Sequence, residues 1–189
     1  MRSTRGRRMR GLRLQAEPLA RQFALQPVRI LGLDPGSVVT GFGVIDVAPS
    51  AATYVASGSI RAGRGALPER LQVIFRHVSE LVAAHAPGIV AIERVFMHLN
   101  PDSALKLGQA RGAAVCGATV AGASVHEYTP REVKLAITGT GAAEKTQVQH
   151  MVKALLAIDG RLGADAADAL AIALCHAHHL GLGRPGGFR

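Results

Sequence analysis

Four acidic residues occur at positions that are difficult to explain as ordinary surface positions. Asp34 and Glu93 each follow directly on an apolar run, as residues at the ends of buried strands do. Asp165 and Asp168 lie three residues apart in an alanine-rich segment, and so share one face if that segment is a helix. Carboxylates that converge repel one another and lose hydration unless a cation neutralises them. The pattern therefore predicts a site for a hard divalent metal ion with oxygen ligands.

Each of these carboxylates also has an ordinary structural interpretation. Asp34 could cap a tight turn, a common use of short acidic side chains. Glu93 could form an ion pair with Arg94 or Arg131. Asp165 could be an N-terminal helix acid that the helix dipole favours. Each interpretation suits one residue alone, whereas a shared metal site explains all four.

Apolar runs predict five strands around these acids. They cover residues 28–34, about 41–47, about 53–60, 89–93 and 124–128. Short turns join the first three strands, which favours an antiparallel meander. The fourth strand is short and apolar, as a buried strand of an α/β unit is.

Helical periodicity and capping signals predict five helices. They cover about 68–86, about 101–121, 130–138, 144–157 and 164–180. The second is rich in glycine and alanine, and each interior glycine costs up to about 1 kcal/mol of helix propensity. Close approach of another backbone would explain that cost. The order of elements predicts an α/β fold: one mixed five-stranded sheet flanked by helices on both faces, as a single domain at residues 28–180.

The charge of the chain is distributed unevenly. The 189 residues, enough for one domain with a core, carry a net charge of +9. Residues 1–27 hold seven arginines and one glutamate, or +6, which leaves +3 for residues 28–189. The globular part is only mildly basic, so nucleic-acid binding requires a local patch and cannot be inferred from net charge.

The basic N-terminal extension, residues 1–27, has three open interpretations. It could be a disordered basic arm that adds phosphate contacts, or an arginine-rich transit peptide. Alternatively it is a mis-assigned start, with the natural start near Val28. Residues 181–189 are expected to form a flexible tail.

The cysteines and the apolar segments exclude several classes of protein. Cys116 and Cys175 form no CxxC pair, which indicates a reduced compartment and inert core thiols. The uncharged stretch Gly112–Val125 is broken by glycine and too short for the roughly 20 residues of a membrane span, and no secretory signal is evident. The histidines after Cys175 would need partners from other segments to bind zinc. We therefore expect a cytoplasmic protein with no membrane partner.

Five segments resemble the RuvC-type crossover junction endodeoxyribonucleases, or Holliday junction resolvases. They are residues 32–37 with 40–41, 91–96, 100–112, 143–152 and 165–171. The order and spacing agree over about residues 28–180. The Asp-Pro-Gly at residues 34–36 would be a weak signal alone, whereas five colinear motifs are specific.

The resemblance implies a ribonuclease-H-like fold, a homodimer and a bacterial enzyme of DNA recombination and repair. Such an enzyme resolves four-way DNA junctions by magnesium-dependent paired nicking that leaves 5′-phosphate ends, together with the RuvA and RuvB branch-migration proteins. Two Mg²⁺ ions per subunit are implied, and Mn²⁺ could substitute. By position, Asp34, Glu93, Asp165 and Asp168 match the family's catalytic, metal-binding carboxylates. Some members have histidine at the position of Asp165.

The resemblance also connects four other residues with DNA. Lys134 and Lys145 align with positions that contact phosphates, and a solvated lysine is the alternative. Arg111 lies on the glycine- and alanine-rich helix, where DNA and dimer contacts are both open. Phe96 matches an aromatic residue that stacks on junction bases, with core packing as the alternative.

Three competing functions follow from the same features. Another ribonuclease-H-like nuclease or strand-transferase would share the carboxylates but lack the segment around Phe96 and the small-residue helix. A sugar-kinase or actin-like phosphotransferase needs two lobes, which 189 residues do not supply. The four retained carboxylates disfavour a noncatalytic junction-binding protein.

Overall fold

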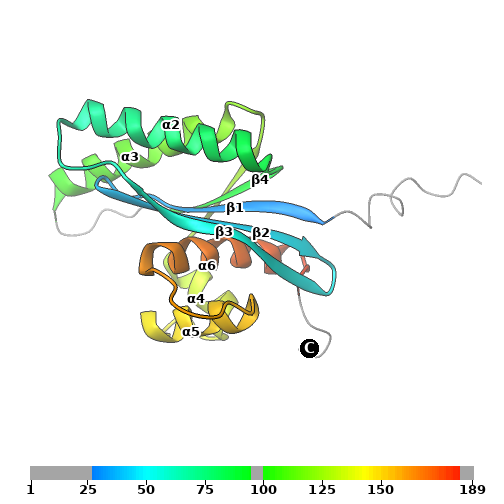
Figure 1. Ribbon diagram of the computed structural model, residues 1–189. Helices are drawn as coiled ribbons and strands as arrows, with labels where there is room; N and C mark the ends of the chain where they lie inside the picture. Colours follow the sequence, from blue (N-terminus) through cyan, green and yellow to red (C-terminus); the bar gives the residue numbers. More distant parts are fainter. Residues whose placement is uncertain (1–26, 95–99, 184–189) are drawn as a thin grey trace, which may run out of the picture.

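The computed structural model describes residues 27–94 and 100–183, in which one sheet lies between two layers of helices (Figure 1). The strands are β1 (Val28–Asp34), β2 (Val39–Ala48), β3 (Ala51–Arg61), β4 (Ile89–Glu93) and β5 (Ser124–Tyr128). Their order is β3-β2-β1-β4-β5. β1 pairs antiparallel with β2 and parallel with β4, and β4 pairs parallel with β5. The predicted mixed five-stranded sheet is confirmed, with β2 and β3 longer than predicted because they form one extended antiparallel ribbon.

The central strand β1 has a nearly continuous apolar sequence because helices cover both of its faces. Ile30 belongs to the hydrophobic cluster on the side of α6. Leu31 and Leu33 belong to the cluster on the side of α2 and α3. All three side chains are fully buried, so β1 joins the two halves of the core.

The first helical layer contains α2 (Leu67–His85) and α3 (Pro101–Thr119). Asn100 caps α3 by accepting hydrogen bonds from the backbone N–H groups of Asp102 and Ser103. A Cβ at Gly117 would lie 2.7 Å from the backbone oxygen of Phe75, so glycine permits close packing of α3 on α2 at this position. Part of the small-residue sequence of α3 is therefore explained within one chain.

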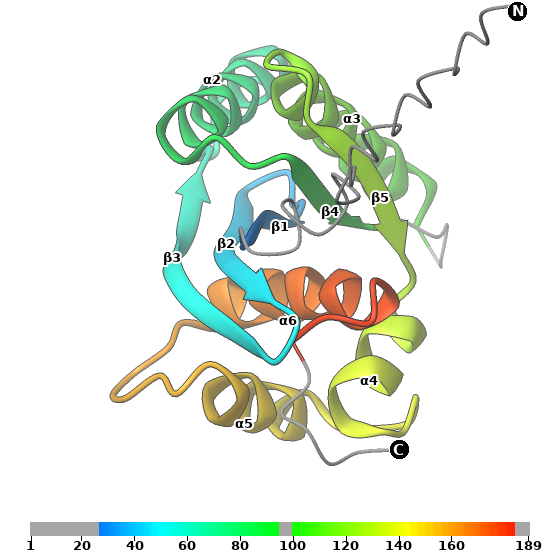
Figure 2. The ribbon, with the colours of Figure 1, turned by 90° about the vertical axis from the view of Figure 1, so that its right-hand side faces the viewer.

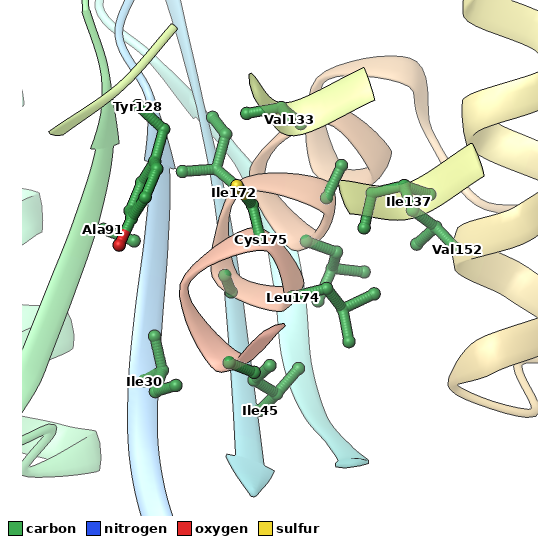
Figure 3. Close-up of a cluster of buried hydrophobic side chains, with 14 of the residues drawn as sticks. Ile30, Ile45, Ala91, Tyr128, Val133, Ile137, Val152, Ile172, Leu174 and Cys175 are labelled. Atoms are coloured by element: carbon green, nitrogen blue, oxygen red, sulfur yellow. The ribbon is translucent and has the colours of Figure 1, made fainter. Parts of the chain in front are cut away.

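The second layer contains α4 (Pro130–Thr138), α5 (Lys145–Leu155) and α6 (Ala164–His179). Helix α6 lies between the sheet and the other two helices, and its apolar residues pack on both sides (Figure 3). The predicted capping box of α4 is present, with Thr129 and Glu132 each bonding the other's backbone N–H. No helix in the described ranges is long and apolar enough to cross a membrane.

His176 is a polar residue on α6 that is only 2% exposed. Its Nδ1 lies 2.6 Å from the hydroxyl of Tyr128, and its Nε2 has no hydrogen-bond partner within the described part of the chain. Burial, together with repulsion from the neighbouring His126 and His179, lowers the pKa of His176 to about 4. The ring is therefore neutral at physiological pH.

This lowered pKa predicts a loss of stability in mild acid. The unfolded chain, in which His176 has a pKa near 6.5, binds the proton more readily, so the stabilisation is complete above about pH 6.5 and is lost as the pH falls toward 4. We expect a loss of roughly 2 kcal/mol at about pH 5 from this residue. His176→Gln, which retains an acceptor for Tyr128, should lose less. Urea unfolding at about pH 7.5 and 5 measures both proteins, and equal losses would contradict this role.

Candidate active site

Two of the predicted carboxylates meet at the carboxyl ends of two central strands because these strands are parallel neighbours. Asp34 ends β1 and Glu93 ends β4, directly after the paired residues Leu33 and Ile92. The two side chains lie within hydrogen-bonding reach of each other, so a proton on one carboxyl group can be shared with the other. The sequence prediction that these strands pair and align the two acids is confirmed.

The turn after Asp34 is held from both sides. The hydroxyl of Thr40, a fully buried residue, donates to the carbonyl of Gly36 at 3.1 Å and accepts from its N–H at 3.3 Å. From α2, Arg70 donates to the carbonyl of Ser37 at 2.9 Å. These contacts fix the path of the chain immediately beyond Asp34.

Three glycines on β1 and β2 allow α6 to approach the sheet. A Cβ at Gly32 would overlap the backbone oxygen of Ala169, and a Cβ at Gly41 would overlap that of Asp165. At Gly43 a Cβ would lie 2.6 Å from the side chain of Leu170. Viewed along the sheet, α6 crosses directly against the strands (Figure 2). The helix that carries the other two acids therefore lies close to the strand backbone at these three positions.

Asp165 lies in the first turn of α6 and Asp168 one turn further on, both partly buried. Asp165 accepts a hydrogen bond from the hydroxyl of Ser59 on β3 at 3.3 Å. Asp168 forms an ion pair with Lys145 at the start of α5, with 2.5 Å between Nζ and Oδ2. The four acids thus come from three separate elements, β1, β4 and α6.

Lys145 is the common electrostatic partner of all four acids. Its pKa is raised, first by its hydrogen bond to Asp168 and further by the charges of Asp34 and Asp165. In return, its charge opposes the rise in the pKa of Glu93. All four carboxylates therefore lie close enough to one ammonium group to interact with its charge.

Burial and mutual repulsion raise the pKa values of the two strand acids. Burial raises the pKa of Asp34 to about 7, and the charges of Glu93 and Asp168 contribute to the rise. Burial also raises the pKa of Glu93, whereas the hydrogen bond from Asp34 opposes this change. The shared proton therefore resides on Asp34. Perturbed carboxylates that share charge in this way are typical of functional sites.

The donor chemistry of the site suits a hard cation. The four side chains offer only oxygen atoms, which Mg²⁺ prefers to nitrogen or sulfur. As they stand, no three His, Cys, Asp or Glu side chains within residues 27–94 and 100–183 form a ready-made metal cluster. The proton on Asp34 and the ammonium of Lys145 supply positive charge instead. Metal uptake would therefore replace these two charges.

The residues predicted to contact DNA occupy different surroundings. Lys134 lies on α4 and Lys145 beside the acids. The guanidinium of Arg111 on α3 contacts Glu127 on β5 and the backbone carbonyl of Glu93. Phe96 lies outside the described residues, and all four DNA contacts stay predictions.

Sequence reasoning did not single out Glu127. It forms ion pairs with Arg94, at 3.6 Å, and with Arg111. The alternative pairing of Glu93 with Arg94 does not occur, because Arg94 faces Glu127. The sequence did contain a signal for Glu127: it is an acidic residue near the end of the strand that follows and pairs with the strand ending in Glu93.

The fold and the site together define a class of protein. A mixed five-stranded sheet in this order with helices on both faces matches the ribonuclease-H-like fold of solved RuvC structures. This chain belongs to the RuvC family: the sequence model described as "Crossover junction endodeoxyribonuclease RuvC" matches residues 30–176.

Individual relatives agree with this assignment. The chain is 54% identical over 152 residues to a crossover junction endodeoxyribonuclease RuvC of Dichelobacter nodosus, a match covering 80% of this chain and 86% of the relative. It is 58% identical over 149 residues to the protein of that name from Pseudomonas putida strain W619, covering 79% and 86%. The predicted family is confirmed.

Solved structures confirm the fold. Thermus thermophilus RuvC in complex with a Holliday junction substrate is 34% identical, with a TM-score of 0.76, covering 82% of this chain and 95% of that one. A yeast mitochondrial Holliday junction resolvase is 11% identical with a TM-score of 0.56, covering 87% and 91%, which shows a shared fold alone.

The contact between α6 and the sheet predicts opposite effects for two glycine substitutions. Gly41→Ala should destabilise the protein by about 1–3 kcal/mol, because the new methyl group overlaps backbone of α6. Gly88→Ala, the matched control just before β4, meets nothing within 4 Å and should be neutral or stabilise by up to about 1 kcal/mol. Denaturant unfolding measures both, and an unimpaired Gly41→Ala protein would contradict the close contact.

Proposed function

We propose that this chain is a structure-selective endonuclease that resolves four-way DNA junctions by magnesium-dependent paired nicking, in DNA recombination and repair. The observation that carries the proposal is the shared interaction of four carboxylates with Lys145. Membership of the RuvC family supports the choice of substrate, and the Thermus thermophilus relative is described in complex with a Holliday junction substrate.

The proposed reaction is hydrolysis of a phosphodiester, whose negative charge repels an attacking hydroxide. Two divalent ions, when bound, would supply charge for the phosphate oxygens and lower the pKa of the attacking water. Asp34, Glu93, Asp165 and Asp168 would hold these ions through carboxylate oxygens. The proton on Asp34 must leave before that residue can act as an anionic ligand. The products are a 5′-phosphate and a 3′-hydroxyl end.

The remaining residues of the site would bind and orient DNA. Lys145 is 61% exposed while it touches Asp168, so its ammonium is accessible to a phosphate. Lys134 is proposed as a further contact with the DNA backbone, and Phe96 as an aromatic residue that stacks on junction bases. A DNA contact by Arg111, the fourth residue of the sequence prediction, competes with its bonds to Glu93 and Glu127. Mg²⁺ is the proposed ion, two per subunit, with Mn²⁺ as a substitute.

Paired nicking requires two active sites on one junction, so we propose a homodimer. On α3, a Cβ at Gly108 or Gly112 would meet nothing within 4 Å in the same chain, unlike one at Gly117. These two glycines are thus free to face a second copy, whereas the buried small residues pack on α2. RuvA and RuvB as partners and a cytoplasmic location complete the proposal.

Replacement of Asp34 should separate binding from cleavage. Asp34→Asn should bind a four-way junction normally but cleave it about 10²–10³-fold more slowly, because an amide cannot supply the anionic ligand. The measurements are gel-shift affinity and strand-resolved cleavage of a synthetic immobile junction with and without Mg²⁺. The matched control is Asp159→Asn, an exposed position.

Asp34→Asn should lower the cleavage rate but raise the stability of the protein, and the effect on stability can be tested without DNA. The pKa of Asp34 is raised to about 7 in the folded protein, so stability is lost as the pH rises from about 4 to 7. Asp34→Asn removes this loss and should melt higher than the parent protein at about pH 8 without metal. Near-normal cleavage by the variant would show that Asp34 lacks the proposed role.

The proposed dimer predicts a specific effect at Gly112. Gly112→Leu should leave the monomer folded, since its side chain meets open space, but should produce monomers at concentrations where the parent is dimeric. Sedimentation equilibrium measures the mass, and thermal unfolding checks the fold. Ala84→Leu, which adds the same side chain at an exposed site on α2, is the control. A fully dimeric Gly112→Leu protein would exclude this surface.

A further inference from the structure

The peptide unit that joins Glu93 to Arg94 is held at both of its polar atoms. Its carbonyl oxygen accepts a hydrogen bond from Nε of Arg111 at 3.2 Å. Its N–H donates to the carbonyl of Tyr128, at the end of β5, at 2.8 Å. One bond is made by a side chain of α3 and the other by the neighbouring strand, so this peptide plane cannot rotate without breaking one of them.

Arg111 is itself held by Glu127. A second nitrogen of its guanidinium contacts the carboxylate of Glu127 on β5, and the Arg111 side chain is only 21% exposed. Glu127 also lies 3.6 Å from Arg94, the residue after Glu93. The fixed planar geometry of a guanidinium means that the contact with Glu127 also sets the direction of the Nε–H bond.

Arg111 contacts the backbone carbonyl of Glu93 and not its carboxylate, and this difference matters chemically. An arginine on the Glu93 carboxylate would neutralise it and compete with a bound cation. An arginine on its backbone carbonyl fixes the end of β4 and leaves the carboxylate free to face Asp34. Repulsion from Asp168 and burial both act on the Glu93 carboxylate, so a fixed backbone at this strand end would hold the side chain in place.

We propose that Arg111 is a positioning residue for Glu93 and that Glu127 orients Arg111 for this purpose. The inference rests on the proposed function, in which Glu93 binds the metal. In this proposal Arg111 acts within the protein and not on DNA, and Glu127 acts by orienting Arg111. Removing the contact should misplace Glu93 while the DNA-binding surface remains intact.

The test compares Arg111→Met, which keeps the apolar stem but lacks donors, with Arg111→Lys, which can donate one hydrogen bond. With a saturating amount of enzyme on a synthetic four-way junction, Arg111→Met should lower the single-turnover cleavage rate by about tenfold to a hundredfold. The Mg²⁺ concentration for half-maximal rate should rise severalfold. Junction affinity and its salt dependence should stay within about twofold of the parent. Arg111→Lys should recover part of the rate.

Three further proteins complete the experiment. Arg76→Ala, which removes an exposed arginine paired with Glu80 on α2, is the charge-matched control and should leave rate and affinity unchanged. Glu127→Gln should slow cleavage less than Arg111→Met does. The double variant Arg111→Met/Glu127→Gln should be no slower than Arg111→Met alone, because Glu127 acts through Arg111.

The possible outcomes are distinct. If Arg111→Met weakens junction affinity, lowers the salt slope by about one and leaves the rate on bound junction unchanged, Arg111 is a phosphate contact and the positioning role is wrong. If Arg111→Met does not fold, Glu127→Gln decides, since its side chain is 42% exposed: an unchanged rate and Mg²⁺ requirement overturn the proposal.

A parent protein that leaves the junction uncut would overturn the proposed function instead. The rise in melting temperature on addition of Mg²⁺ without DNA then still tests the positioning role. Arg111→Met should need more Mg²⁺ than the parent for the same rise, and an identical titration would exclude it.

Discussion

The close approach of α6 to the centre of the sheet is the contact on which the rest of the site depends. At Gly32, Gly41 and Gly43 no side chain separates the strands from the helix, so the first turns of α6 approach the strand backbone directly at these positions. A layer of ordinary side chains would separate helix from sheet by the usual distance of about 10 Å between packed layers. Asp165 and Asp168 would then lie too far from the strand acids to share charge with them. Backbone packing, and not loop geometry, therefore assembles the site.

The sequence predicted the fold well because its signals are local. The capping box at Thr129, the proline in the first turn of α2 and the apolar run of β1 each act within a few residues. The family resemblance then ordered the same elements into one sheet. Predicted helix ends shifted slightly, because packing and caps decide where a helix ends.

Contacts between distant segments could not be predicted in the same way. The pairing of Arg111 with Glu127, and its bond to the Glu93 carbonyl, depend on how α3 lies across β4 and β5. The glycines of α3 illustrate the same limit. Composition predicted one close backbone contact, whereas the structure places Gly117 against α2 and leaves Gly112 facing open space. The residue types indicated that an arginine would need an acidic partner and that glycines would allow close packing. Only the three-dimensional structure shows which residue is the partner of each.

The charge balance of the site explains how four acids can stay together before a metal binds. Asp34 holds a proton, and Asp168 holds the ammonium of Lys145, so two positive charges already lie among the carboxylates. One divalent ion carries the same charge as these two groups. Exchange of the proton and the ammonium for the first of the two proposed ions would therefore leave the net charge of the site unchanged, and the second ion would reduce the repulsion among the carboxylates. Lys145, once released from Asp168, would be available to a phosphate, which links metal uptake to DNA contact through a single side chain.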